Sequence, residues 1–325
     1  MSKAIRIYKT GGPEVLKWEN IDVKVPGYGE AKILHKAIGL NYIDVYGRTG
    51  LYALPSLPHT LGVEAAGIVE AVGEGVSNVV IGDRIAYVMS LPGAYSEERI
   101  VPASHLIKLP DEVSAETAAA MMLKGMTAQY LLNQTYNLKA GDHVLIHAAA
   151  GGVGLIVCQW AKHLGAKVIG TVGSKEKAAL AESHGCDYAI VYTQENFKDR
   201  VLEITKGEGV DVVYDSIGES TFMNSLDSLK PLGMMVTFGN ATGPITPFSP
   251  KILAAKGSLF ITRPTIFTYI AKRENMVSMA TELFKIVTSG AVKIQINQTY
   301  NLRDADQAHT DLEARKTTGS TILIP

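Results

Sequence analysis

The feature that most constrains the fold is a series of short apolar segments, separated by helical stretches, that starts after Met126. These segments are rich in β-branched residues and occupy positions 143–148, 167–173, 188–192, 210–218 and 234–239. Between them the sequence predicts helices at 153–164, 175–184 and 197–205. Strands that alternate with helices form a parallel, doubly wound sheet covered on both faces. We therefore predict an α/β unit of this kind.

A glycine-rich turn follows the first of these strands. It reads Ala149, Ala150, Gly151, Gly152, Val153, Gly154, and a helical stretch comes directly after it. The run matches the dinucleotide pattern G-x-G-x-x-G, with Ala149 in place of the first glycine. Glycines let the backbone approach a diphosphate, and a helix N-terminus offers free N–H groups and the positive end of its dipole. The sequence therefore predicts a dinucleotide at this turn.

The end of the second strand bears on the choice between NADH and NADPH. Sheets that bind NAD carry an acidic residue there, about 20 residues after the glycines, which holds the ribose 2′-hydroxyl. In this chain Val172, Gly173 and Ser174 stand at that end, no carboxylate precedes Glu176, and Lys177 follows. The missing acid and the nearby donors favour NADPH, whereas the alternative is that the lysines only begin a solvated helix.

Further cofactor contacts are expected where the other strands end, because ligands of such sheets lie beyond the carboxyl ends of the strands. The residues at these ends are Tyr192, Ser216, Phe238, Gly239 and Asn240. An aromatic side chain in such a place is equally compatible with simple packing.

The rest of the chain has a different texture. The first 124 residues contain short strands broken by Gly and Pro, with one helix predicted at 114–122. Near the end, a helix is predicted at 277–290 with Val277, Ala280, Leu283, Phe284 and Val287 on its apolar face, followed by strands at 291–296 and 320–325. The chain is thus expected to return to its first domain. The hexamer NQTYNL occurs at 133–138 and at 297–302, and we read this repeat as coincidence.

Composition excludes several classes of function. Lys and Arg number 31 against 32 Asp and Glu, so nothing in the overall charge favours nucleic acid or an anionic membrane as a partner. Two cysteines, Cys158 and Cys186, are too few for a disulfide framework or a four-cysteine zinc lobe. No signal peptide or membrane span is predicted, and a cytoplasmic location is expected.

Several motifs together carry a family resemblance. They are Gly141-Asp142-x-x-Leu145, the glycine turn with Gln159-x-x-Lys162, and the run Asn41-x-x-Asp44-x-Tyr46-x-Arg48-x-Gly50-x-Tyr52 followed by Gly62-x-Glu64-x-Ala66-Gly67. With Gly257-Ser258-Leu259 and Thr262-Arg263-Pro264, the chain resembles the quinone oxidoreductase and ζ-crystallin family. That family belongs to the zinc-free part of the medium-chain dehydrogenase/reductase superfamily. The likeness covers essentially the whole chain.

The resemblance implies a GroES-like catalytic domain at 1–124 and 265–325, and a Rossmann-type domain at 125–264, with NADPH and a quinone in the cleft between them. It implies that the substrate pocket contains Asn41, Tyr46, Tyr52 and Arg263. The cofactor residues that it implies are Tyr42, Tyr46, Thr127, Tyr130, Gly151, Gly152, Val153, Gly173, Ser174, Lys177, Tyr192, Ser216, Phe238, Gly239 and Asn240, with Arg315 near the 2′-phosphate.

Zinc relatives in the superfamily hold their catalytic metal with Cys, His and Cys, so the metal must be considered. Aligned on the Asp44 and Glu64 motifs, these ligands fall on Asn41, on Val63 and within 123–125, where no such ligand occurs. We therefore expect no metal. Without a Lewis acid, an alkoxide is poorly stabilised, whereas a quinone spreads the incoming charge over its own conjugated system. Hydride transfer then depends on positioning and on donors such as Asn41, Tyr46 and Tyr52.

The sequence thus predicts an NADPH:quinone oxidoreductase that acts on a quinone or a related electrophile. One alternative is an NADPH-dependent alkenal or enone reductase. An alternative of another class is an NADPH-regulated binding protein with an RNA-binding or structural role. We also expect a homodimer, because the apolar segment 258–262 would otherwise leave an exposed sheet edge.

Overall fold

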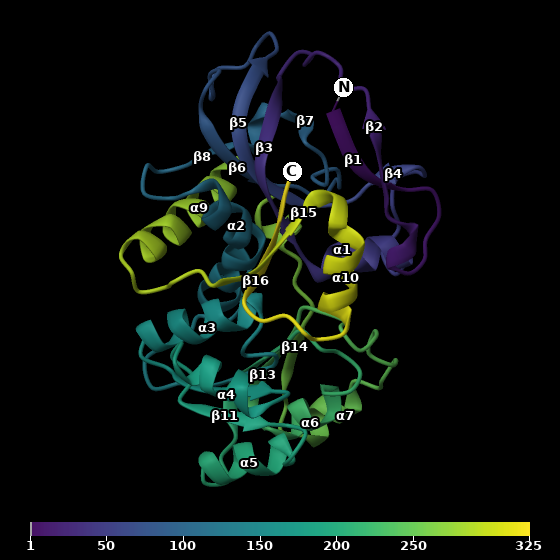
Figure 1. Cartoon of the computed structure of the whole chain (residues 1–325). Coiled ribbons are helices and arrows are strands. Elements are labelled where there is room, and N and C mark those ends of the chain that lie inside the picture. Colours follow the sequence, from purple (N-terminus) through teal and green to yellow (C-terminus); the bar gives the residue numbers. More distant parts are fainter. Residues whose placement is uncertain (1) are drawn as a thin grey trace. The chain divides into compact units, whose positions relative to one another are not determined.

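The structure, a computed structural model, describes residues 2–325 (Figure 1). The chain packs into two compact units. Unit 1 contains the residues up to Met126 together with Ile270–Thr288 and Ile294–Pro325, and unit 2 contains Thr127–Tyr269 and Ser289–Lys293. The functional domain limits implied by the resemblance stay a prediction. Within residues 2–325 no helix is both long and apolar enough to cross a membrane.

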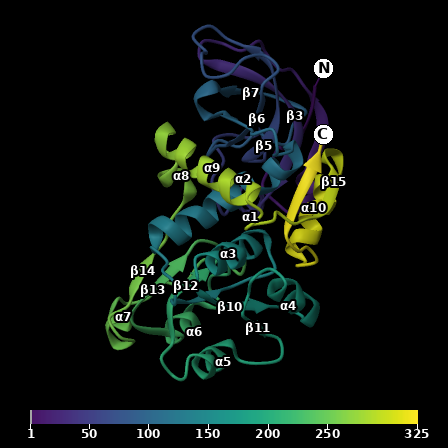
Figure 2. The same cartoon turned by 90° about the vertical axis from the view of Figure 1, so that its left-hand side faces the viewer.

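Unit 2 is built on a six-stranded parallel sheet with the order β11-β10-β9-β12-β13-β14. Its strands are β9 (His143–Ile146), β10 (Lys167–Val172), β11 (Tyr188–Val191), β12 (Val210–Asp215), β13 (Leu229–Thr237) and β14 (Phe260–Thr262). Its helices are α3 (Gly152–His163), α4 (Lys175–Glu182), α5 (Phe197–Ile204), α6 (Phe222–Asp227), α7 (Lys251–Ala255) and α8 (Ile266–Tyr269). Figure 2 shows α3 and α4 on one face of the sheet and α5 and α6 on the other. The predicted doubly wound α/β fold is confirmed.

The central parallel strands are largely buried and rich in apolar residues because helices cover both faces of the sheet. All six residues of β12 are buried, and so are Val144, Leu145 and Ile146 of β9. In a strand that is solvated on one side, every second residue would instead be polar. The continuous β-branched runs were therefore the correct signal for these strands.

Unit 1 contains two sheets. A three-stranded sheet has the order β2-β1-β4, and a larger one has the order β15-β16-β3-β5-β6-β8, with β7 paired to β3. The strands are β1 (Ser2–Ile7), β2 (Lys17–Ile21), β3 (Glu30–Leu40), β4 (His59–Thr60), β5 (Glu64–Val72), β6 (Arg84–Val88), β7 (Glu98–Pro102), β8 (Ile107–Lys108), β15 (Ile296–Asn301) and β16 (Ser320–Ile324). The helices are α1 (Tyr42–Thr49), α9 (Arg273–Thr288) and α10 (Ala305–Glu313), and α2 spans Ala115–Tyr130 at the boundary of the units. The GroES-like, β-rich unit is as predicted.

Helix α2 is longer than the predicted helix at 114–122. It continues through Gly125 to Tyr130, and a π-helical turn at Leu131–Thr135 follows. A glycine weakens an exposed helix, but here a Cβ on Gly125 would lie 2.5 Å from a methyl carbon of Leu283. Close packing of α9 against this position explains why a glycine stands inside α2.

The C-terminal predictions need two corrections. Val277 is 38% exposed, and the buried face of α9 consists of Met276, Met279, Ala280, Leu283 and Phe284. The helix begins at Arg273, so its buried stripe includes methionines that the shorter prediction omitted or left off its face. The strand expected at 291–296 instead begins at Ile296, where pairing with β16 starts.

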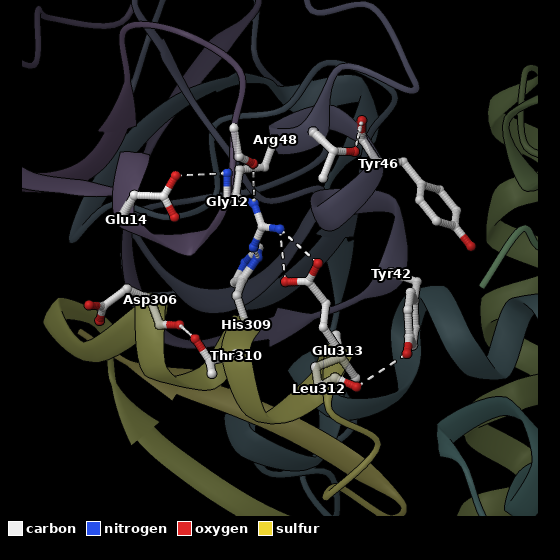
Figure 3. A network of polar contacts seen from close by, with 12 residues as sticks. Gly12, Glu14, Tyr42, Tyr46, Arg48, Asp306, His309, Thr310, Leu312 and Glu313 are labelled. Atoms are coloured by element: carbon white, nitrogen blue, oxygen red, sulfur yellow. Dashed lines mark hydrogen bonds and ion pairs between the residues drawn. The ribbon is translucent and has the colours of Figure 1, made fainter. Parts of the chain in front are cut away.

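A buried arginine ties α1 to α10 within unit 1 (Figure 3). Arg48 has an exposed fraction of 1%, and its Nη2 donates to both carboxylate oxygens of Glu313 at 2.8 Å. Its Nη1 lies 3.1 Å from Nδ1 of His309, and its Nε donates to the carbonyl oxygen of Gly11 at 3.1 Å. Because the planar guanidinium has donors in fixed directions, it can satisfy all three partners at once.

Replacing this arginine should destabilise the chain more than replacing an exposed one. Arg48→Met leaves Nδ1 of buried His309 without a donor, so the free energy of unfolding should fall by about 1–3 kcal/mol. Arg6→Met is the matched control, because Arg6 pairs with Glu19 on the surface and its loss should cost about 0–1 kcal/mol. Urea unfolding of both variants measures the difference. Equal losses would contradict the role given to Arg48.

Candidate functional site

The glycine turn follows the central strand β9 of unit 2. Its backbone is tightly folded, since a Cβ on Gly154 would lie 2.2 Å from the carbonyl oxygen of Ala148. Ala148 itself adopts φ of 54°, a left-handed conformation. Gly151 is the N-cap of α3, and the chain continues from there into twelve helical residues. The turn thus presents the N-terminus of a full-length helix at the carboxyl end of β9, a suitable place for a diphosphate.

The strand order places this turn at the point where the winding of the sheet reverses. β9 lies between β10 and β12, so the chain winds outward in one direction through β10 and β11 and in the other through β12, β13 and β14. Ligands of open α/β sheets bind at such a switch point. The end of β9 is therefore the expected position of a dinucleotide, independently of the glycine pattern.

The end of β10 carries no acid. Val172 is buried there, and Ser174 caps α4 by accepting a hydrogen bond from the backbone N of Lys177 at 3.3 Å. A Cβ on Gly173 would lie 3.0 Å from the hydroxyl of Tyr192, so these two residues are neighbours. A hydroxyl and a lysine at this strand end fit a 2′-phosphate better than a 2′-hydroxyl.

The ends of β12, β13 and β14 also meet. A Cβ on Gly239 would lie 2.3 Å from the carbonyl oxygen of Ser216, which explains the glycine. Arg263 donates to the carbonyl oxygen of Gly239 at 3.2 Å, and Phe238 is partly exposed beside them. In the amide orientation that satisfies both of its polar atoms, Asn240 accepts from Nη2 of Arg263 at 3.0 Å. The predicted residues of these strand ends therefore form one contiguous group.

Two tyrosines stack at the end of α2 in unit 2. The rings of Tyr130 and Tyr269 are nearly parallel, with centroids 4.4 Å apart and an interplanar angle of 10°. Burial raises the pKa of Tyr130, and a hydrogen bond with the side chain of Thr127 opposes this rise. Tyr269 also lies 2.8 Å, oxygen to oxygen, from Thr135. Thr127 and Tyr130 were predicted, whereas Tyr269 was not.

In unit 1 the predicted tyrosines line up along α1. The ring centroids of Tyr42 and Tyr46 are 6.1 Å apart, and those of Tyr46 and Tyr52 are 5.1 Å apart with an edge-to-face angle of 63°. Tyr46 is buried, while Tyr52 is 39% exposed. The backbone N of Tyr52 donates to the carbonyl oxygen of Tyr46 at 3.0 Å, which holds the chain after α1 against the helix.

Asn41, at the N-cap of α1, is largely committed to the protein itself. Its Nδ2 donates to Oε1 of Glu64 at 2.7 Å and weakly to the carbonyl oxygen of Gly39 at 3.5 Å. Its backbone N donates to Oδ2 of Asp44 at 2.9 Å. Arg315 also lies in unit 1, just after α10, with φ of 58°. Unit 1 therefore holds Asn41, Tyr42, Tyr46, Tyr52 and Arg315, and the other predicted site residues lie in unit 2.

A buried chain of hydrogen bonds leads from Arg48 to Asp44. Arginine can only donate, so Nδ1 of His309 must accept from it and Nε2 must carry the proton. Nε2 lies 3.0 Å from the hydroxyl of Tyr95, which in turn donates to Oδ2 of Asp44 at 3.1 Å. Burial, together with the charge of Arg48, lowers the pKa of His309 to about 3, so this imidazole is neutral.

Asp44 is the unusual member of this chain. Burial raises the pKa of its carboxyl to about 7, against the opposing hydrogen bonds from Asn41 and Tyr95. Its Oδ1 is buried and has no hydrogen-bond partner among residues 2–325. Sequence analysis noted Asp44 only as part of a motif. Neither the hydrogen-bond chain nor the pKa could be inferred, because His309 is more than 200 residues away in the sequence.

The chain is similar to known proteins over its whole length. The family model described as "Zinc-binding dehydrogenase" matches residues 152–284, and the one described as "Alcohol dehydrogenase GroES-like domain" matches residues 27–111. The quinone oxidoreductase of Pseudomonas aeruginosa is 51% identical, with 100% of both chains covered. A 2-haloacrylate reductase from a Burkholderia species is 45% identical, with 100% of this chain and 99% of the relative covered. The crystal structure of Escherichia coli quinone oxidoreductase complexed with NADPH has a TM-score of 0.98 and 48% identity, and the match covers 99% of this chain and 100% of that one.

One of these descriptions mentions zinc, and the residues present do not fit it. The amide nitrogen of Asn41 is a donor only, so it has no lone pair to offer a metal, and its N–H groups donate to Glu64 and Gly39. Val63 has no donor atom, and at 123–125 the structure places the side chain of Lys124, a cation. Within residues 2–325 there is no cluster of three or more His, Cys, Asp or Glu that could hold a metal ion.

The raised pKa of Asp44 predicts a pH dependence of stability. In the unfolded chain its pKa is about 3.9, so between about pH 4 and pH 7 the folded chain binds more protons and loses stability as the pH rises. Relative to Asp44→Asn, the unmodified protein should lose at most about 1.4 kcal/mol per pH unit in this window. Thermal unfolding from pH 4 to pH 8 measures this.

The control for this experiment is Asp83→Asn. A hydrogen bond from Lys108 lowers the pKa of Asp83, so the stability that this carboxylate contributes is lost only as the pH falls below about 4. The curves of the unmodified protein and Asp83→Asn should therefore run nearly parallel between about pH 5 and pH 8. Parallel curves for the unmodified protein and Asp44→Asn between pH 4 and pH 7 would contradict the assignment.

Proposed function

Because this chain belongs to the quinone oxidoreductase family of the medium-chain dehydrogenase/reductase superfamily, we propose that it oxidises NADPH and reduces a quinone. The single observation that carries this function is the full-length identity of about half to quinone oxidoreductases, one of which is seen with NADPH. The glycine turn at the switch point and the acid-free end of β10 support the choice of cofactor. The chain acts as an enzyme in this proposal, and nucleic acid and membranes are not expected partners.

In this proposal the turn Gly151–Gly152–Val153 holds the diphosphate of NADPH. The cofactor then contacts the residues at the strand ends, which include Gly173, Tyr192, Ser216 and Asn240. Ser174, Lys177 and Arg315 bind the 2′-phosphate, since a hydroxyl and two cations supply the donors that this anion needs. Thr127, Tyr130, Tyr42 and Tyr46 complete the cofactor set. When bound, NADPH supplies the hydride, while the protein positions the reactants.

The quinone is proposed to contact Asn41, Tyr46, Tyr52 and Arg263. Tyr46 and Tyr52 stand next to each other at the end of α1, so their hydroxyls can donate to the quinone oxygen on which negative charge develops. Asn41 has its amide hydrogens turned toward Glu64 and Gly39, so its part is to shape and orient the pocket wall. No step in this scheme uses a metal ion.

A reductase for activated alkenes is the second candidate. The observation in its favour is the full-length relative that is a 2-haloacrylate reductase. Both reactions place negative charge on a conjugated acceptor and need the same cofactor. An NADPH-regulated binding protein, the candidate of another class, draws no support from a net charge of −1.

Stopped-flow oxidation of NADPH by a quinone and by an enone, in parallel, tests the proposed function. The quinone should be reduced with the higher kcat/KM, and the rate should survive a chelator. Tyr52→Phe should lower quinone turnover by about tenfold to a thousandfold, since one positioned donor is lost. The control Tyr28→Phe alters an exposed tyrosine and should change nothing. Full turnover in both Tyr52→Phe and Asn41→Ala would refute the proposed pocket.

Preference for NADPH should depend on Lys177. Lys177→Ala should weaken NADPH binding by about tenfold or more, because a charge-assisted hydrogen bond contributes roughly 1.5–3 kcal/mol. NADH affinity should hardly change, and the loss should shrink at high salt. Lys285→Ala, at an exposed lysine of α9, is the control. Fluorescence titration of the three proteins with NADPH and with NADH gives the dissociation constants. Equal values for NADPH and NADH in the unmodified chain would contradict the argument.

We further propose a cytoplasmic homodimer with the domain limits 1–124, 265–325 and 125–264. β14 is an edge strand that pairs only with β13 among residues 2–325, and its Phe260 is 56% exposed. Edges of this kind are usually paired or covered. Sedimentation at micromolar concentration should give a dimer, and Phe260→Lys should shift it toward monomer. A monomer in the unmodified protein would rule out this assembly.

A further inference from the structure

The most deeply buried carboxylate of unit 1 stands beside the position of the missing metal. Glu64 opens β5 and has an exposed fraction of 0%. Its Oε2 accepts from the backbone N of Leu123 at 2.6 Å, and its Oε1 accepts from Nδ2 of Asn41 at 2.7 Å. Burial of an ionised carboxylate is unfavourable unless it is both hydrogen-bonded and paired with a cation. The two N–H groups supply hydrogen bonds but no charge.

Lys124 supplies the charge. Its Nζ donates to Oε1 of Glu64 at 3.3 Å and to the carbonyl oxygen of Leu40 at 3.1 Å. The residue is 7% exposed, and it comes from α2, a helix otherwise made mostly of Ala, Met and small residues. Lysine is rarely buried unless it is paired. A lysine in such a helix therefore has a specific partner, and Glu64 is that partner.

The space around this pair is filled. A Cβ on Gly39 would lie 2.2 Å from Oε1 of Glu64 and 2.4 Å from the carbonyl oxygen of Ala119. Only glycine at this point of β3 lets the carboxylate lie where Asn41 and Lys124 reach it. Strand β3, helix α1 and helix α2 all meet at this one carboxyl group through these contacts.

Two of the three positions at which zinc relatives carry their metal ligands fall on this group of residues, at Asn41 and within 123–125. We propose that the Lys124 ammonium takes over the charge of the absent metal ion, and that it acts through Glu64 as a positioning residue for Asn41. An ionised carboxylate can only accept hydrogen bonds, so the amide nitrogen of Asn41 must face Glu64. The Lys124 ammonium balances the charge of the buried Glu64 carboxylate, and Oε1 of Glu64 accepts from Nδ2 of Asn41, which holds the Asn41 amide in one orientation.

Two experiments test the inference, and the first of them rests on the proposed function. It is a double-mutant cycle in which each variant is assayed for quinone reduction at saturating NADPH. Lys124→Met and Asn41→Ala should each lower kcat by about tenfold or more, with the KM for NADPH little changed. Because Lys124 acts through Asn41, the double variant should be no slower than the slower single variant. Lys108→Met, at an exposed lysine paired with Asp83, should keep the kcat of the unmodified chain.

Multiplicative losses in the double variant would overturn the inference, and so would an unchanged kcat in Lys124→Met. Lys124→Arg should recover part of the activity, because it restores the cation. If the unmodified chain does not reduce quinones at all, the proposed function fails, and the thermal test below decides the inference by itself.

The second test needs no activity. Lys124→Met leaves the carboxylate without its cation and should lower the thermal midpoint, whereas Lys124→Met/Glu64→Gln removes both charges and should recover most of the loss. A double variant as unstable as Lys124→Met, or one that fails to fold, would overturn the inference, since two neutral side chains need no charge balance.

Discussion

Unit 2 depends on one close approach of the backbone, at the turn after β9. The carbonyl oxygen of Ala148 occupies the space that a side chain at Gly154 would need, and α3 can begin there only because that side chain is missing. This contact sets the direction of α3 relative to the sheet, and it turns the first N–H groups of the helix toward the carboxyl end of β9. Sheet order then adds the ends of β10, β12 and β13 around the same point. The residues of this unit that we propose to bind the cofactor are contiguous because of this turn and the strand order.

Unit 1 follows a different constraint, the pairing of buried charges. Arg48 meets Glu313 across α1 and α10, and Lys124 meets Glu64 across α2 and β5. Asp44 forms no ion pair within the described part of the chain, and burial raises the pKa of its carboxyl. These groups fix the backbone on both sides of Asn41 and along α1, which carries the tyrosines proposed to contact the quinone. The substrate pocket proposed here needs side chains held in fixed positions, and buried ion pairs supply part of that rigidity.

Much of this could be read from the sequence, for physical reasons. Parallel strands buried on both faces leave continuous apolar runs, and the segments of unit 2 were found from them. Where a segment can adopt several conformations equally well, its conformation could not be predicted from the sequence. The hexamer NQTYNL enters a π-helical turn at 133–138 but forms most of β15 at 297–302, where β16 pairs with it. Val277 was placed on the wrong face of α9 because the buried stripe of this helix runs through Met276 and Met279, which the prediction did not include.

Some residues of the candidate site could be predicted from the sequence, and others could not. Glycines and strand ends have local signals, so Gly151, Ser174 and Gly239 were accessible from the sequence alone. Lys124 was not singled out, because its partner Glu64 lies 60 residues away and only the folded chain brings them together. A single lysine in an apolar helix was the one available signal. Tyr269 gave none, since its stacking on Tyr130 depends on the position of α8.

The affinity of NADPH for the variant Gly151→Ala tests the central claim most directly, because the proposed binding of NADPH depends on this turn. Gly151 has φ of −83° and ψ of 177°, which alanine also adopts, and an added methyl first meets the carbonyl oxygen of Ala148, at 3.1 Å. The variant should therefore fold, yet its methyl group should hold the diphosphate away from the helix N-terminus. We predict a dissociation constant for NADPH that is higher by about tenfold or more. A folded variant that binds NADPH as tightly as the unmodified chain would contradict the account.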